Sequence, residues 1–68
     1  MFKEIKIVIV MPAYNEEEII HSVIMDIKKK LINFNYSILI LNDGSTDNTL
    51  KKLENFKSDE KILIIDKD

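Results

Sequence analysis

The chain has 68 residues, no cysteine, one histidine and a formal net charge of -2. A domain of this length buries only about 60% of its unfolded surface, and without cysteine neither disulfides nor thiolate zinc sites stabilise it. Its basic residues are all lysine and are outnumbered by acidic ones. Because nucleic-acid surfaces carry clustered arginine and lysine, this balance argues against a nucleic-acid partner.

The apolar runs of the chain are short. The run Ile7–Met11 is far too short to span a bilayer. Charged residues at Lys3, Glu4 and Lys6 interrupt any apolar leader at the amino terminus. We therefore expect a cytoplasmic protein.

The first half of the chain predicts a strand followed by a helix. Ile5–Met11 is apolar on both faces apart from Lys6, which is typical of a buried strand, and Pro12 is predicted to end it. Asn15 and Glu18 have the spacing of a helix-capping box, and Lys28–Lys30 suits the last helical turn. Between them, apolar residues recur at helical spacing: Ile20, Val23, Ile24, Ile27 and Leu31.

The second half repeats this order. Tyr36–Leu41 predicts a second buried strand, an acidic loop follows, and a short amphipathic helix comes next. Either Ser45 or Asp47 is expected to cap that helix, and the pattern does not choose between them. Ile62–Ile65 predicts a third buried strand. The expected apolar face of the second helix consists of Leu50, Leu53 and Phe56.

The element order is β-α-β-α-β, which predicts an α/β fold with a Rossmann-like, three-stranded parallel sheet. Right-handed crossovers place both helices on one face of such a sheet. Parallel sheets normally have cover on both faces, and an unpaired edge strand is a template for pairing with another chain. We therefore expect residues 1–68 to form a single partial domain that self-associates through its exposed sheet edge.

Both strand-to-helix loops are expected at the same edge of the sheet, where ligands bind in open α/β folds. The first loop carries Tyr14 and Glu16, and the second carries Asp43 and Gly44, the only glycine of the chain. A ring and a carboxylate suit a nucleoside, because the carboxylate accepts hydrogen bonds from base N–H or ribose hydroxyl groups. Ordinary turn and capping roles explain the same residues equally well.

The segment Val10–Glu16, followed after one helix by Leu41–Asp47, resembles family 2 glycosyltransferases. The Pro-x-Tyr-Asn-Glu form is most similar to the dolichol-phosphate-mannose synthase-like branch. The resemblance covers nearly the whole chain but only the first part of the family's catalytic domain. The resemblance implies the N-terminal half of a GT-A fold. It also implies an enzyme that transfers a sugar from a nucleotide diphosphate sugar to an acceptor such as a lipid phosphate or polysaccharide. The acceptor would lie at the inner face of a membrane.

The resemblance also implies roles for residues. Asp43 would contact the base or ribose, and no catalytic residue would lie in this chain. Asn42 stands where the family usually has aspartate. A divalent metal, Mg or Mn, is expected for the full enzyme with ligands outside this chain, because the segment 66–68 spells the family's metal motif too early. The implied nucleotide-sugar-binding residues are Pro12, Ala13, Tyr14, Glu16, Leu41, Asp43 and Ser45.

Two other functions compete with this one. The short length favours a non-catalytic nucleotide-binding or interaction module. A sugar nucleotidyltransferase has a similar fold but holds a triphosphate on a glycine-rich, basic loop after the first strand. Here that loop has neither glycine nor a basic residue, and Glu16–Glu18 would repel a triphosphate.

Overall fold

The computed structural model describes residues 5–44 and 46–67. The elements alternate as the sequence predicts, and the second helix continues into a short 3-10 turn. In chain order they are β1 (Lys6–Ala13), α1 (Ile20–Lys30), β2 (Asn35–Asp43), α2 (Thr49–Leu53), η2 (Glu54–Phe56) and β3 (Ile62–Lys67).

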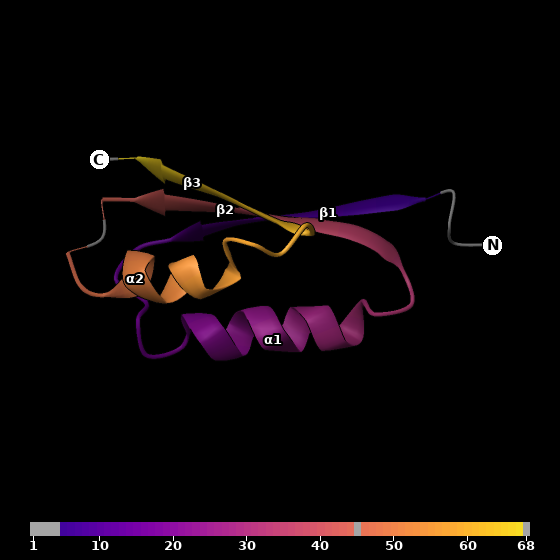
Figure 1. The fold of residues 1–68 in the computed structure, drawn as a ribbon, viewed down its shortest axis with the longest axis horizontal. Coiled ribbons are helices and arrows are strands. Elements are labelled where there is room, and N and C mark those ends of the chain that lie inside the picture. Colours follow the sequence, from indigo (N-terminus) through magenta and orange to yellow (C-terminus); the bar gives the residue numbers. More distant parts are fainter. Residues whose placement is uncertain (1–4, 45, 68) are drawn as a thin grey trace.

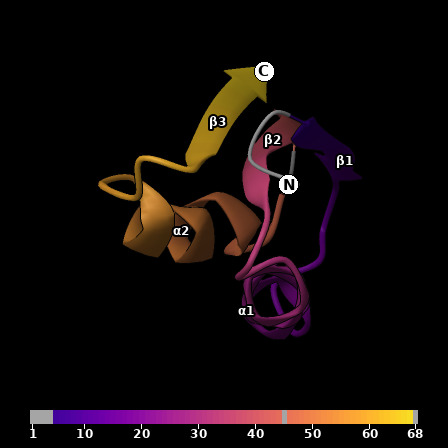
Figure 2. The same ribbon diagram turned by 90° about the vertical axis from the view of Figure 1, so that its right-hand side faces the viewer.

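The three strands form one parallel sheet in the order β1-β2-β3 (Figure 1). Both helices lie on the same face of this sheet, as the two perpendicular views show (Figures 1 and 2). The register pairs Ala13 with Asn42 and Asn42 with Asp66, so the carboxyl ends of all three strands meet at one edge. The prediction of a Rossmann-like β-α-β-α-β sheet is confirmed.

The core lies between the sheet and the two helices. Ile20 and Ile24 of α1 are fully buried against Ile38 and Ile40 of β2, and Leu53 of α2 joins them. Each such side chain contributes about 2 kcal/mol when it leaves water. The apolar spacing of the first helix is confirmed, because its remaining predicted residues are half-buried: Val23, Ile27 and Leu31.

The opposite face of the sheet is apolar and is covered by none of the described elements. Val10 of β1 is 57% exposed and Leu63 of β3 is 61% exposed. Both flank Leu39, the middle strand's residue in the same register row. We call this surface the bare face; it consists of Val8, Val10, Pro12, Leu39, Leu41, Leu63 and Ile65.

Strand β1 runs through Pro12 and ends at Ala13, so the prediction that Pro12 ends the strand is wrong. Pro12 lies opposite Leu41 in the parallel register. Because β1 is an edge strand in this sheet, a residue whose nitrogen faces outward loses no ladder hydrogen bond. The other strands also extend two residues beyond the predicted runs, to Asp43 and Lys67.

Helix α1 begins later than predicted, and the expected capping box is wrong. Its N-cap is Ile19, which makes no side-chain capping bond, and the amides of Ile19 and Ile20 donate to the carbonyl of Glu16. Asn15 lies before this turn with a positive φ of 51°. Its side chain bonds to the second loop instead, so a tertiary contact replaces the local cap.

Candidate nucleotide site at the carboxyl edge of the sheet

Two loops form this edge: residues 14–19 after β1 and residues 44–48 after β2. The second loop turns at Gly44, whose φ of 66° suits glycine. The Gly44 amide donates to the carbonyl of Lys67 at 2.7 Å. The turn is therefore held against the end of β3 as soon as it leaves β2.

Asn15 joins the first loop to the second. Its Oδ1 atom accepts hydrogen bonds from the amide of Thr46 at 2.7 Å and from the amide of Asp47 at 3.3 Å. The hydroxyl of Thr46 donates to the same oxygen at 3.3 Å. One side-chain oxygen thus holds three donors of a loop about thirty residues away in the sequence.

Asp47 and Thr49 complete the connection from the other side. The amide of Glu16 donates to Thr49 Oγ1 at 2.7 Å, and the amide of Glu17 donates to Asp47 Oδ2 at 3.3 Å. Asp47 Oδ1 accepts from both the amide and the hydroxyl of Thr49. We call this set the loop clasp; it consists of the side chains of Asn15, Thr46, Asp47 and Thr49 with the amides of Glu16 and Glu17.

The clasp sets the charge state of Asp47. Partial burial raises the pKa of this carboxyl, but hydrogen bonds from the Thr49 hydroxyl and from the amides of Thr49 and Glu17 lower it more. The net pKa lies below the ordinary value, so Asp47 is ionised at neutral pH. The N-cap of α2 is Asn48, without a side-chain capping bond, so the prediction of Asp47 at that position is wrong and Ser45 lies outside the described residues. Asp47 precedes the cap and accepts from the amide of Thr49, the first residue of the helix.

Three of the predicted binding residues lie together on one side of the sheet. Pro12 and Leu41 are register partners on the bare face, and alternation along β2 places Asp43 on that same face. Asp43 is exposed and is the last residue of β2. An apolar floor therefore ends in an exposed carboxylate at the loop edge.

Two further predicted residues lie in the first loop. Tyr14 is 57% exposed directly after β1, and Glu16 is half-buried beside the clasp. Ala13 differs from both, because its side chain is fully buried in the core on the helix-covered side. The whole residue has no exposed surface, so a ligand at this edge does not reach it in the described fold. Ser45, the remaining predicted residue, lies outside the described residues.

Sequence reasoning missed Thr49 and misplaced Asn15. Thr49 is fully buried, and its only signal in the sequence is its position two residues after Asp47. Threonine and aspartate at that spacing pair frequently in turns that start helices. Asn15 carried a signal of its own, since asparagine is one of the few residues that tolerate positive φ.

Asn42, which stands where the family usually has aspartate, is 2% exposed on the core side of β2. Its Nδ2 atom donates to Asp66 Oδ1 of β3 at 2.8 Å. An aspartate at position 42 would bring a second carboxylate against Asp66 in a buried place. The amide therefore suits the neighbour that this chain supplies.

The described residues do not fit a metal site. Residues 5–44 and 46–67 contain no group of three or more side chains of the types that bind metal ions. Asp66 pairs with the amide of Asn42 rather than with a second carboxylate, and Asp68 lies outside the described residues.

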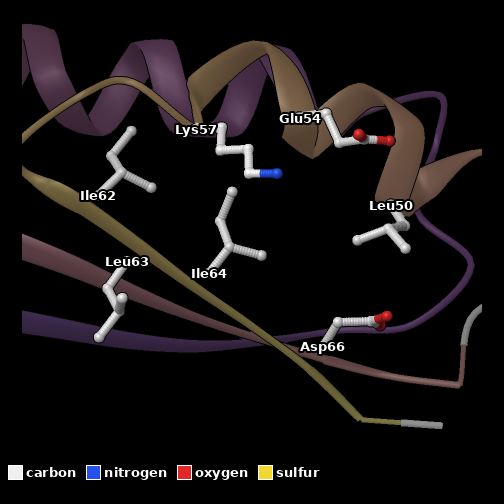
Figure 3. Close-up of a pocket in the computed structure, with 7 residues that line it drawn as sticks. All are labelled: Leu50, Glu54, Lys57, Ile62, Leu63, Ile64 and Asp66. Atoms are coloured by element: carbon white, nitrogen blue, oxygen red, sulfur yellow. The ribbon is translucent and has the colours of Figure 1, made fainter.

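A groove of different character runs along the outer side of β3 (Figure 3). Leu50, Glu54 and Lys57 line it from the helix side, and Ile62 and Ile64 line it from β3. Leu63, labelled in the same view, points to the other side of the sheet. Asp66 also lines the groove and accepts from Asn42, so the groove borders the core and reaches the carboxyl end of β3.

The fold is a parallel α/β sheet, a class of fold in which ligands bind beyond the carboxyl ends of the strands. Residues 8–68 match Glycosyl transferase family 2, and the chain belongs to this family. It is 38% identical, over 97% of its length, to the Bacillus subtilis (strain 168) protein named "Uncharacterized glycosyltransferase YkcC". It is 27% identical, over 81% of its length, to "Uncharacterized glycosyltransferase YfnE" of the same organism. The chain spans 21% of YkcC and 14% of YfnE.

Within the described residues, no helix is long and apolar enough to cross a membrane.

Proposed function

We propose that this chain is the donor-nucleotide part of a glycosyltransferase that transfers a sugar from a nucleotide diphosphate sugar. One observation carries the proposal: the two motifs of the family lie on adjacent strand ends and are joined by hydrogen bonds between side chain and backbone. Family membership and the glycosyltransferase names of both relatives support the reaction class. The proposed binding side chains are Pro12, Tyr14, Glu16, Leu41 and Asp43, with Ser45 beside them; Ala13 is fully buried and is not among them.

The chemistry of this edge suits a nucleoside. The Asp43 carboxylate accepts hydrogen bonds from ribose hydroxyls or from a base N–H, and it is exposed at the end of a rigid strand. Pro12 and Leu41 offer an apolar surface next to it, and the exposed ring of Tyr14 offers a stacking surface. A planar base with a sugar requires this combination of apolar area and a few polar groups.

We also propose that the chain alone does not turn over a nucleotide sugar. The leaving diphosphate carries developing charge, which such enzymes stabilise with cationic groups or a metal. The residues that we assign to this edge are neutral or acidic, so those groups are expected in the remainder of a catalytic domain several times longer, as in the relatives. Turnover of any nucleotide sugar by the purified 68-residue chain would contradict this assignment.

The acceptor belongs to the same proposal. The dolichol-phosphate-mannose synthase-like form of the first motif supports a lipid phosphate or a polysaccharide acceptor, handled at the cytoplasmic face of a membrane. A non-catalytic nucleotide-binding module is the second candidate. Sugar transfer from a radiolabelled donor to polyprenyl phosphate by the full-length gene product distinguishes these two functions.

The binding proposal has a direct test. We expect uridine or guanosine diphosphate to bind the full-length protein and to bind the 68-residue chain weakly if at all. Asp43→Ala should abolish this binding, because it removes the only carboxylate that the strand end directs to the bare-face side. Titration calorimetry measures the affinity of the wild type and of Asp43→Ala. Asp26→Ala, on the exposed side of α1, is the matched control. Equal affinity of the wild type and Asp43→Ala would refute the role of Asp43.

A further inference from the structure

We propose that the loop clasp positions the donor site, with Asn15 and Asp47 acting as positioning residues rather than as ligands of the nucleotide. This inference rests on the proposed function, because it concerns the same edge of the sheet. It assigns Asn15 and Asp47 a task different from that of Tyr14 and Asp43, which precede them in the two family motifs. Tyr14 and Asp43 present groups to the donor, and the clasp fixes the distance between the two loops that carry them.

The clasp is placed for this task. Asn15 lies between Tyr14 and Glu16 in the first loop, and Asp47 lies four residues after Asp43 in the second. The two loops exchange bonds in both directions: Asn15 accepts from amides of the second loop, and side chains of the second loop accept from the amides of Glu16 and Glu17. A shift of one loop therefore has to break several hydrogen bonds together.

The polar side-chain atoms of Asp47 and Thr49 are committed within the clasp. Asp47 Oδ1 accepts from Thr49 while Oδ2 accepts from the amide of Glu17. The Thr49 hydroxyl has one hydrogen, which it donates to Asp47, and its oxygen accepts from the amide of Glu16. Thr49 is fully buried, so a nucleotide does not reach it. This arrangement suits a supporting layer beneath a binding surface and not the surface itself.

The physical gain is preorganisation. Loops that must be ordered during binding weaken affinity, because their lost conformational freedom is subtracted from the contacts they make. A binding group displaced by about 1 Å also loses much of its contribution. Without the clasp, Tyr14 and Asp43 would move on separate loops, and we expect the affinity for a nucleoside diphosphate to fall at least about tenfold.

The experiment separates the acceptor atom of Asn15 from its backbone conformation. Asn15→Gly keeps a residue that accepts positive φ but removes Oδ1, whereas Asn15→Asp keeps an oxygen acceptor at a residue type that also tolerates positive φ. Asn48→Ala is the matched control, because Asn48 is an asparagine of the second loop that is exposed and makes no side-chain capping bond to α2. Each variant of the full-length protein is titrated with uridine and guanosine diphosphate and examined by amide hydrogen exchange.

We expect Asn15→Gly to lose at least about tenfold in affinity while remaining folded, Asn15→Asp to retain affinity within about threefold, and Asn48→Ala to match the wild type. In the wild type the amides of Glu16, Thr46 and Asp47 should be protected from exchange, and Asn15→Gly should lose this protection at Thr46 and Asp47. Rescue by Asn15→Asp is the result that a general loss of stability does not give.

Two results would overturn the inference separately from the proposed function. Unchanged affinity of Asn15→Gly, alongside loss of binding in Asp43→Ala, would refute the positioning role and leave the donor site standing. Unchanged exchange at Thr46 and Asp47 in Asn15→Gly would refute the clasp without reference to any nucleotide. If the wild type binds neither diphosphate although these amides are protected, the proposed function fails and the positioning role fails with it.

Discussion

At the scale of single residues, the pair Asn42 and Asp66 shows how a departure from a family motif can be balanced by a neighbour. The buried amide of Asn42 donates to Asp66 across two strands at 2.8 Å. A hydrogen bond to a charged group in a buried place contributes more than an exposed one, and removing one partner leaves the other poorly solvated. The identity of residue 42 is therefore tied to that of residue 66.

We expect Asn42→Asp to lower the free energy of unfolding by about 1–3 kcal/mol at pH 7, because it places a buried carboxylate next to the exposed carboxylate of Asp66. Adding Asp66→Asn should restore most of this loss, since the amide and the carboxylate then exchange places. The deficit of the single variant should also shrink as the pH falls and one carboxyl gains a proton. Denaturant titrations of the three proteins measure this, and an additive effect of the two substitutions would contradict the pairing.

At the scale of elements, the end of α1 is fixed to the turn before β3 by an ion pair between Lys28 and Asp59. The hydrogen bond from the Lys28 ammonium holds the pKa of Asp59 below its ordinary value, and the amide of Lys61 contributes in the same direction. Both side chains are more than two-thirds buried. This pair joins two segments that are distant in the sequence, whereas Lys30 and Asp26 form an exposed pair within one helix.

A carboxyl whose pKa is lowered on folding adds stability above its unfolded pKa and loses it as the pH falls through the folded pKa. We therefore expect Asp59→Asn to cost up to about 1 kcal/mol at pH 7 and progressively less below about pH 4. Asp26→Asn should change stability far less at either pH, because its pair is exposed. Thermal unfolding of the wild type and both variants from pH 7 to pH 2 checks this. A deficit that is independent of pH would show that Asp59 acts through packing.

The order and faces of the elements followed from the sequence because each rests on a local pattern. The apolar residues of α1 recur at helical spacing, and the strands are short runs rich in isoleucine and leucine. The boundaries were less predictable, because tertiary contacts decided them. Asn15 has the residue type of a helix cap, yet its oxygen bonds to Thr46 in another loop.

The candidate site was likewise predictable in part from the sequence. Its location at the strand ends followed from the alternation of strands and helices, and the expected role of Asp43 from its place at the carboxyl end of the second strand. The burial of Ala13 depends on which face of β1 turns toward the helices, and a run that is apolar on both faces does not reveal this. The role of Thr49 depends on contacts across the two loops, which no periodicity encodes.

At the scale of the whole molecule, the bare face is a solvent-exposed apolar surface that a compact domain would bury. It joins apolar side chains of all three strands in adjacent register rows, such as Val10, Leu39 and Leu63. Exposed apolar areas of this kind mark contacts with other protein surfaces. Family members several times longer have the chain needed to cover it.

We expect the 68-residue chain to be marginally stable as a monomer and to self-associate, because one face of its sheet and the outer edge of β1 are both unpartnered in the described fold. Size-exclusion chromatography combined with chemical denaturation measures both properties. Leu63→Lys should reduce association, whereas Lys51→Ala on the exposed side of α2 should not. A monodisperse monomer with a steep, cooperative transition would mean that residues 1–68 form a complete domain.

The strand order has a consequence for how the protein folds. Each strand pairs with the next strand in the sequence, so paired residues are separated by no more than about thirty positions, which favours rapid folding for a parallel sheet. The hydrogen bonds between the two loops involve no residue after Thr49, whereas the bond from Gly44 to Lys67 requires β3. On a ribosome, the loop clasp can therefore form while later parts of a longer polypeptide are still being made. Apolar side chains of the bare face would then await those later parts, and a chaperone that holds nascent chains would have most to protect at this stage.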